Sequence, residues 1–299
     1  MMKKLHRQDI IRYVIALFCV MIVVLLSLRR EEKSVQYDIV LLGDSVVGNT
    51  WGEVHVTSVM EERLGKTVFN GAFGGSCMSV HNRQLWGSMS GTEWCMAKLA
   101  EAIAYDNWTS QLAVMSYAAS YSDVNLQVLD YFEERMHTLA QIDFSQVEIL
   151  MIQQGTNDYN SGKPVDNPKD LYDVTTFGGA LRYSLRIIKE KYPQLRIVLV
   201  SPTYCALGAD YKQQCYNTSY REGGILDEYV ELEKQIAQEY GVEWIDAYHE
   251  SGIWEDNMDT YLIDALHPNT EGHVLIGNLI ADYLEAGNDK SDKLEANTQ

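Results

Sequence analysis

The chain is short of basic residues: its 299 positions hold 24 Lys and Arg against 42 Asp and Glu, for a formal net charge of −18. The shortage is greatest after position 36, where 17 basic residues face 39 acidic ones. A surface of this sign repels phosphate backbones, so nucleic acid is excluded as an expected partner. The acidic balance favours solubility and identifies no substrate by itself.

Cysteine is also scarce, and no C-x-x-C or clustered Cys/His spacing of the kind that binds zinc occurs. Cys19 lies in an apolar segment, and the other four cysteines follow it. Cys77 and Cys95 are close in sequence, as are Cys205 and Cys215, and both pairs lie in loop-like regions. Two local disulfides in an oxidising, extracytoplasmic compartment are therefore one expectation. Free buried thiols are the alternative, because spacing does not fix connectivity.

Long apolar runs are limited to one, from Ile10 to Leu28, in which Arg12 is the only charged residue. This run approaches the roughly 20 apolar residues that a membrane-spanning helix needs. A cleaved signal peptide has a shorter apolar core and an A-x-A-like site, which residues 27–30 do not provide. We therefore predict that residues 1–36 form a cytoplasmic and transmembrane anchor with a linker.

The anchor is predicted to be single-pass, with the following domain on the extracytoplasmic side. Basic residues flank the run on both sides, with Lys3, Lys4 and Arg7 before it and Arg29 and Arg30 after it. The positive-inside rule, which counts Lys and Arg on each side, therefore leaves the orientation open.

After the anchor, short apolar runs alternate with amphipathic helical patterns, and no internal repeat is present. This alternation predicts an α/β fold in which a parallel five-stranded sheet has helices on both faces, a three-layer flavodoxin-like arrangement. We predict one domain over residues 37–287 and a disordered polar tail over 288–299. The predicted strands are 39–42, 66–70, 147–153, 196–200 and 242–245. The predicted helices are 53–64, 177–191, 225–240 and 269–285, with helical patches at 93–104 and 125–140.

Unusual polar residues follow three of these strands. Gly43-Asp44-Ser45 follows the first strand, the segment from Asn70 to Ser76 the second, and Gly155-Thr156-Asn157-Asp158 the third. A fourth group, Asp264 to Asn269, precedes the last helix. Because the working loops of such a sheet follow the carboxyl ends of its strands, all four groups are expected at one edge.

Together these groups supply the parts of an acyl-transfer site. A serine hydroxyl needs a base to become a nucleophile, and His267 can serve Ser45 in this way. Asp264 lies three positions before His267, so one turn can deliver the base and the carboxylate that orients it. The backbone N–H groups of Ser45 and Gly75 and the side-chain amide of Asn157 are the candidate oxyanion donors.

The order GDS, a glycine after a strand-terminal asparagine, GTND and DALH resembles the four sequence blocks of the SGNH, or GDSL-like, hydrolase family. In this resemblance Ser45 stands for the nucleophile, and Asp264 and His267 stand for the acid and the base. Gly75 and Asn157 stand for the oxyanion-hole residues, although the adjacent Gly74 can fill the same position. The resemblance implies a flavodoxin-like fold and ester chemistry without a metal or an organic cofactor.

The chain departs from the family in two respects. The first block reads GDSVVG rather than GDSL, and Ser45 and Asn157 are 112 positions apart, more than in compact members. The surplus, within residues 78–143, is expected to form a lid or a substrate wall. The G-x-S-x-G elbow of the other common class of serine hydrolases is absent.

The leading hypothesis is a serine esterase, or acylhydrolase, that forms an acyl-Ser45 intermediate and deacylates a cell-surface glycan or lipid ester. One alternative is an acyltransferase that passes the acyl group to a glycan hydroxyl. A third hypothesis is an inactive glycan-binding protein with the same fold. The expected partners are an acylated small-molecule, lipid or glycan substrate and the membrane, and the sequence does not indicate an oligomeric state.

Overall fold

The computed structural model describes residues 35–48, 52–80, 84–85, 89–119, 126–208 and 212–296. All of them except Val35 belong to one compact unit that spans Gln36–Gln299. The predicted anchor and Cys19 lie outside the described residues. Among the helices of the described part, none has the length and apolar composition needed to cross a membrane.

The sheet that the sequence predicts is confirmed: five parallel strands lie in the order β2-β1-β5-β6-β9. This is the strand order of flavodoxin-like sheets. Every residue of β1 and β5 is buried, as expected for strands covered on both faces. In sequence order the strands are β1 (Ile39–Gly43), β2 (Val68–Asn70), β5 (Ile149–Gln153), β6 (Arg196–Val200) and β9 (Glu243–Ile245).

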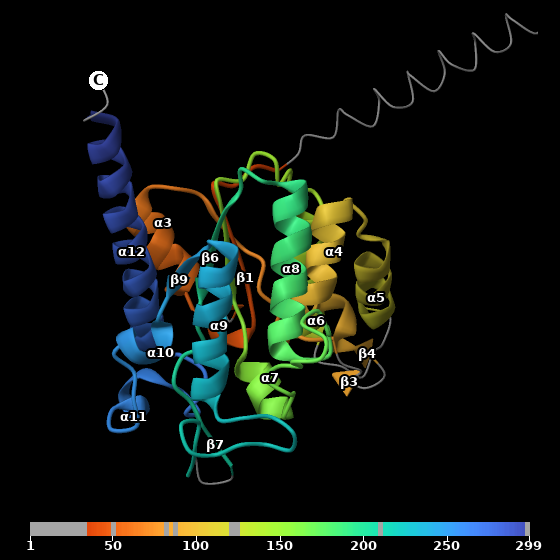
Figure 1. The fold of residues 1–299 in the computed structure, drawn as a ribbon, viewed down its shortest axis with the longest axis vertical. Helices are drawn as coiled ribbons and strands as arrows, with labels where there is room; N and C mark the ends of the chain where they lie inside the picture. The colour runs from red at the N-terminus through yellow and green to blue at the C-terminus, as the bar shows by residue number, and fades with distance from the viewer. Residues whose placement is uncertain are drawn as a thin grey trace, which may run out of the picture. The chain divides into compact units, whose positions relative to one another are not determined.

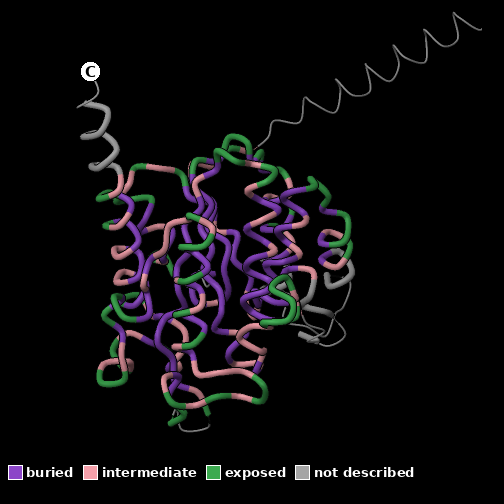
Figure 2. Tube along the Cα trace, viewed as in Figure 1, coloured by how far each residue is buried: buried purple, intermediate pink, exposed green. Residues whose placement is uncertain are grey.

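Two groups of helices enclose the sheet (Figure 1). On one side α3 (Val56–Leu64) packs against α12 (Thr270–Ala296), and on the other α8 (Phe177–Lys191) packs between α4 (Met96–Tyr105) and α9 (Leu226–Tyr240). Figure 2 shows the buried residues concentrated in the sheet and on the inner faces of these helices. The hydrophobic core is therefore continuous from the sheet into both groups of helices.

The long stretch between β2 and β5 is mainly helical. Besides α4 it contains α5 (Thr109–Ala119) and α6 (Leu126–Leu139), which pack against each other. The remaining described elements are short: α2 (Ser45–Gly48), β3 (Gln84–Leu85), β4 (Met89–Ser90), the 3₁₀ helix η2 (Gly91–Trp94), α7 (Thr156–Ser161), β7 (Ala206–Leu207), β8 (Gln213–Gln214), α10 (Ala247–Glu250) and α11 (Met258–Tyr261).

The end of the chain differs from the prediction. The sequence predicts a helix over 269–285 and a disordered tail from 288, whereas α12 continues to Ala296. Lys, Leu, Glu and Ala, which occur in residues 288–296, are good helix formers, and this segment contains no proline. The polar composition that predicts disorder is thus also compatible with a helix that prolongs a packed one.

The two disulfides predicted as one alternative are not present, because Cys77, Cys95, Cys205 and Cys215 are free, buried thiols. Cys205 and Cys215 are neighbours across the β7–β8 hairpin, where the Cys205 N–H donates to the Cys215 Sγ at 3.4 Å. Burial raises the pKa of the Cys95 thiol to about 12. The disulfide alternative is wrong because a buried free cysteine packs as a small apolar residue, so four buried cysteines need not form bridges.

Glu233 is a fully buried carboxyl group on α9, which packs against β9. Burial raises its pKa well above the ordinary value of 4.5. The folded protein therefore keeps a proton on Glu233 that the unfolded chain loses as the pH rises above about 4.5. The stability that protonated Glu233 contributes is present at low pH and is lost as the pH rises through the folded-state pKa.

We predict that Glu233→Gln removes this loss, because an amide stays neutral at every pH. The free energy of unfolding of the variant, relative to that of the wild type, should rise between pH 5 and pH 8 in urea titrations. The exposed Glu231→Gln on the same helix serves as the control and should show no such rise. A pH-independent difference for Glu233→Gln would contradict the prediction.

Candidate active site

The structure brings the predicted nucleophile, base and acid together at the carboxyl edge of the sheet. Ser45 begins α2 directly after β1, and His267 lies in the loop before α12. The His267 Nε2 is 2.8 Å from the Ser45 Oγ, and the His267 Nδ1 is 2.7 Å from the Asp264 Oδ2. Three side chains from distant parts of the chain thus form one line of hydrogen bonds.

The Asp264 carboxylate determines which atoms donate and which accept in this line of hydrogen bonds. Its Oδ1 accepts the backbone N–H of His267 at 2.8 Å and that of Leu266 at 3.3 Å. Burial disfavours the charge, but the hydrogen bonds from His267 outweigh it and lower the pKa of Asp264. An ionised carboxylate only accepts, so the shared proton is on the His267 Nδ1 and the Nε2 accepts the Ser45 hydroxyl proton.

The loop that carries Asp264 and His267 holds a strained backbone. Ala265 has a φ of +59°, in the left-handed region that costs a residue other than glycine about 1–3 kcal/mol. Its carbonyl accepts the Ala206 N–H from β7 at 2.9 Å, and the His267 carbonyl accepts the Ile263 N–H at 2.8 Å. These contacts fix a conformation in which the Asp264 carboxylate reaches both the backbone and the ring of His267.

The glycine loop after β2 passes beside the serine. A Cβ added to Gly74 would lie 3.7 Å from the Ser45 Cβ, so the backbone comes close to Ser45 here. The Ser76 N–H donates to the Phe73 carbonyl at 3.0 Å and closes a turn in which Gly75 has a φ of +73°. This φ favours glycine, so the backbone conformation explains the glycine at position 75. At position 74 the close approach to Ser45 explains it.

Asn157, in the first turn of α7, lies next to Asp44, the residue before Ser45. Asp44 is fully buried, and its Oδ1 accepts the Val46 N–H at 2.9 Å. Burial raises the pKa of Asp44 to about 7, against the opposing effects of the Val46 N–H and the Asn157 side chain. Asp44 therefore connects the start of α2 with the asparagine predicted as an oxyanion donor.

Two buried residues to which the sequence analysis assigns no role, Asp158 of the GTND group and Gln154, support the glycine loop. Asp158 accepts the backbone N–H groups of Met78 and Ser79 at 2.7 and 3.0 Å, and the Ser79 hydroxyl at 2.5 Å. Gln154 donates from its Nε2 to the Ser76 Oγ at 2.9 Å. Residues after β5 thus hold the end of the loop after β2. The position of Gln154 directly after a buried strand is the signal that could have identified it, and Asp158 belongs to the GTND group that the sequence already places at this edge.

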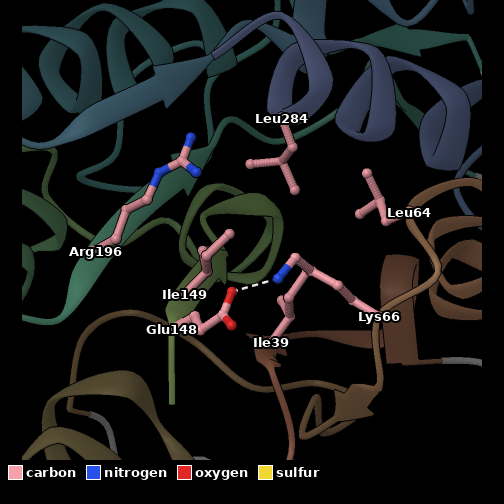
Figure 3. Close-up of a pocket in the computed structure, with 7 residues that line it drawn as sticks. All are labelled: Ile39, Leu64, Lys66, Glu148, Ile149, Arg196 and Leu284. Carbon is pink, nitrogen blue, oxygen red and sulfur yellow. Dashed lines mark hydrogen bonds and ion pairs between the residues drawn. The ribbon is translucent and has the colours of Figure 1, made fainter. Parts of the chain in front are cut away.

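A cavity of about 130 Å³ lies at the opposite, amino-terminal edge of the sheet (Figure 3). Lys66 and Glu148 form an ion pair in its wall. Its volume is below the roughly 300–1,000 Å³ of typical ligand pockets. The cavity holds no part of the Ser45 group, and its lining consists of Ile39, Leu64, Lys66, Glu148, Ile149, Arg196 and Leu284.

Solved structures share this fold. A protein from Lactobacillus plantarum is 20% identical, covers 84% of this chain and 98% of its own, and has a TM-score of 0.56. A possible lipase from Chitinophaga pinensis is 17% identical, covers 84% and 98%, and has a TM-score of 0.50. No curated protein sequence matches the chain.

The model of the GDSL-like Lipase/Acylhydrolase family matches residues 41–275, a range that includes both the GDS turn and the DALH loop. Because this match covers most of the chain and all four polar groups at the carboxyl edge, the protein belongs to the GDSL-like Lipase/Acylhydrolase family and is an ester hydrolase.

Proposed function

We propose that the protein is a serine esterase that works through an acyl-Ser45 intermediate. The observation that carries the proposal is the hydrogen-bonded line from the Ser45 Oγ through the His267 ring to the Asp264 carboxylate. This arrangement activates a serine for attack on an acyl carbonyl.

In the first half of the reaction the His267 Nε2 takes the Ser45 proton while the Oγ attacks the carbonyl carbon. The Asp264 carboxylate stabilises the imidazolium that results. His267 then gives its proton to the leaving alcohol, and the acyl group stays on Ser45. In the second half His267 removes a proton from water, which attacks the acyl-serine and releases the acid.

The negative oxygen of each tetrahedral intermediate needs hydrogen-bond donors. We assign this role to the N–H groups of Ser45 and Gly75 and to the Asn157 amide. Ser45 is the first residue of α2, and the first N–H groups of a helix have no acceptor within it. The passage of the glycine loop beside Ser45 and the position of Asn157 next to Asp44 support the other two donors.

Hydrolysis is favoured over transfer to a sugar hydroxyl because the site is open to solvent. The Asp264 side chain is 41% exposed and that of His267 is 20% exposed, so water can reach the base. The intact line of hydrogen bonds likewise favours an enzyme over an inactive glycan-binding protein.

The proposed substrate is an acyl ester on a cell-surface glycan or lipid, and it depends on the proposed membrane anchor. The support for the anchor is the apolar run from Ile10 to Leu28. The free thiols remove the disulfide argument for an extracytoplasmic domain, so the side of the membrane is a separate proposal. Protease added to intact spheroplasts that express the chain should digest the domain, whereas protection of the domain would place it inside.

We predict that Ser45→Ala lowers the turnover of p-nitrophenyl acetate by at least about 10³-fold and abolishes labelling by a fluorophosphonate, because the Ser45 hydroxyl is the group bonded to the His267 Nε2. The full chain, purified in detergent, should be compared with this variant and with Ser145→Ala, which changes an exposed serine and should retain full activity. Equal turnover by wild type and Ser45→Ala would overturn the proposed nucleophile.

We predict that Asp264→Asn lowers kcat by about 10²–10⁴-fold, because an amide cannot hold the His267 ring in the required tautomer. The chain offers a matched control in Asp246→Asn. Asp246 and His249 have the same spacing, with 3.0 Å from the Nδ1 to the carboxylate, but no serine is bonded to His249 among the described residues. Equal losses of kcat in the two variants would contradict the role of Asp264.

A further inference from the structure

Arg135 lies on α6 and reaches both α2, which begins with Ser45, and the glycine loop after β2. Its side chain is only 7% exposed. The Nη1 donates to the Gly48 carbonyl at 3.3 Å and also to the Ala72 carbonyl. Gly48 is the last residue of the nucleophile helix α2, and Ala72 is part of the glycine loop, so one guanidinium group bridges the two.

Two side-chain donors reach the end of α2. The last carbonyls of any helix have no partner within it, and α2 has only four residues. The Asn70 amide donates to the Val47 carbonyl at 2.9 Å, and Arg135 serves the next carbonyl, that of Gly48.

Little space separates α2 from the glycine loop, so the two segments have little freedom to move relative to each other. A Cβ added to Gly48 would lie 3.1 Å from the Ala72 Cβ and 3.3 Å from its carbonyl oxygen. The two segments are therefore already in contact where Arg135 joins them. A shift of α2 relative to the glycine loop would have to break the bonds from Arg135 to both carbonyls.

A second side chain of α6 packs on the same loop. The Phe132 ring is 5.4 Å from that of Phe73, edge to face, and 6.0 Å from that of Trp94. A Cβ added to Gly74 would lie 3.6 Å from the Phe132 ring. α6 thus supports the loop by an apolar contact at Phe132 and by a charged donor at Arg135, one turn later.

We propose that Arg135 is a positioning residue, which fixes the glycine loop relative to Ser45 so that the oxyanion donors meet the developing charge. The expected effect of Arg135 on kcat rests on the proposed function. It also gives α6, which lies within the surplus segment expected to be a lid or a wall, a role in support of the site.

The chemistry of arginine suits this position. A guanidinium group is planar and carries several N–H donors, so it can bond two carbonyl oxygens at once, whereas a lysine presents a compact charge. Arg135 is buried, and this desolvation of the guanidinium lowers its pKa to about 8. Carbonyl dipoles on two sides compensate part of that cost.

The test is Arg135→Met in the full chain, with kcat and KM for p-nitrophenyl acetate measured at least about 15 °C below each variant's Tm. A misplacement of about 1 Å can cost about 10²-fold in rate, so we expect kcat to fall by about 10- to 100-fold with KM changed less than about threefold. Arg135→Lys should recover part of kcat. It also keeps the kinetic test possible if Arg135→Met does not fold.

Arg182→Met is the matched control. Arg182, on α8, is also 7% exposed but pairs with Asp166 and with Glu239 of α9, away from the residues that Arg135 contacts. This variant should lower Tm and leave kcat within about twofold of the wild type. If Arg135→Met loses no more kcat than Arg182→Met, the positioning role is overturned.

Amide hydrogen exchange provides a readout that does not need activity. Exchange in residues 43–48 and 70–79 should be faster in Arg135→Met than in both the wild type and Arg182→Met. If the wild type has no esterase activity but this local increase occurs, the proposed function fails and the positioning role stands. Unchanged exchange in these segments would overturn the positioning role whatever the activity.

Discussion

The active site depends on an abrupt change of direction at the end of β1, where a buried strand becomes a helix within one residue. Gly43 has no room for a side chain there, because a Cβ would lie 2.5 Å from a Val47 methyl carbon and 2.9 Å from the Gln153 carbonyl oxygen. Asp44 then accepts the Val46 N–H and starts α2. This turn exposes Ser45 at the edge of the sheet, and the other groups at the site are arranged around it.

The sequence predicts the regular elements that build this edge and the residues with reactive side chains. The amphipathic pattern and the apolar run give α8 and β6 their observed bounds, Phe177–Lys191 and Arg196–Val200. The short helices α2, α7, α10 and α11 are not predicted, since four to six residues are too few for a periodic pattern. The hydrophobic period also cannot tell that the run from Leu112 to Tyr117 belongs to a helix, α5.

The supporting residues of the site are harder to predict for a different reason. Arg135 binds the carbonyl oxygens of Gly48 and Ala72, and Asp158 binds the N–H groups of Met78 and Ser79. Backbone groups are the same at every position, so no pairing of residue types in the sequence reveals these contacts. A serine, a histidine and an aspartate, by contrast, are chemically distinctive, and their spacing relative to the strands is enough to group them.

The line from Ser45 to His267 joins positions that are 222 residues apart. Between them lie four of the five strands and most of the helices, so the two side chains meet only after almost the whole sheet has been assembled. Contacts at such sequence separation form late and slow the folding of a chain, because the entropy of closing the intervening loop must be overcome first. A nascent chain that ends before Asp264 therefore cannot bear the complete hydrogen-bonded group, and esterase activity would report that the chain has been built past β9 and folded rather than the presence of a serine.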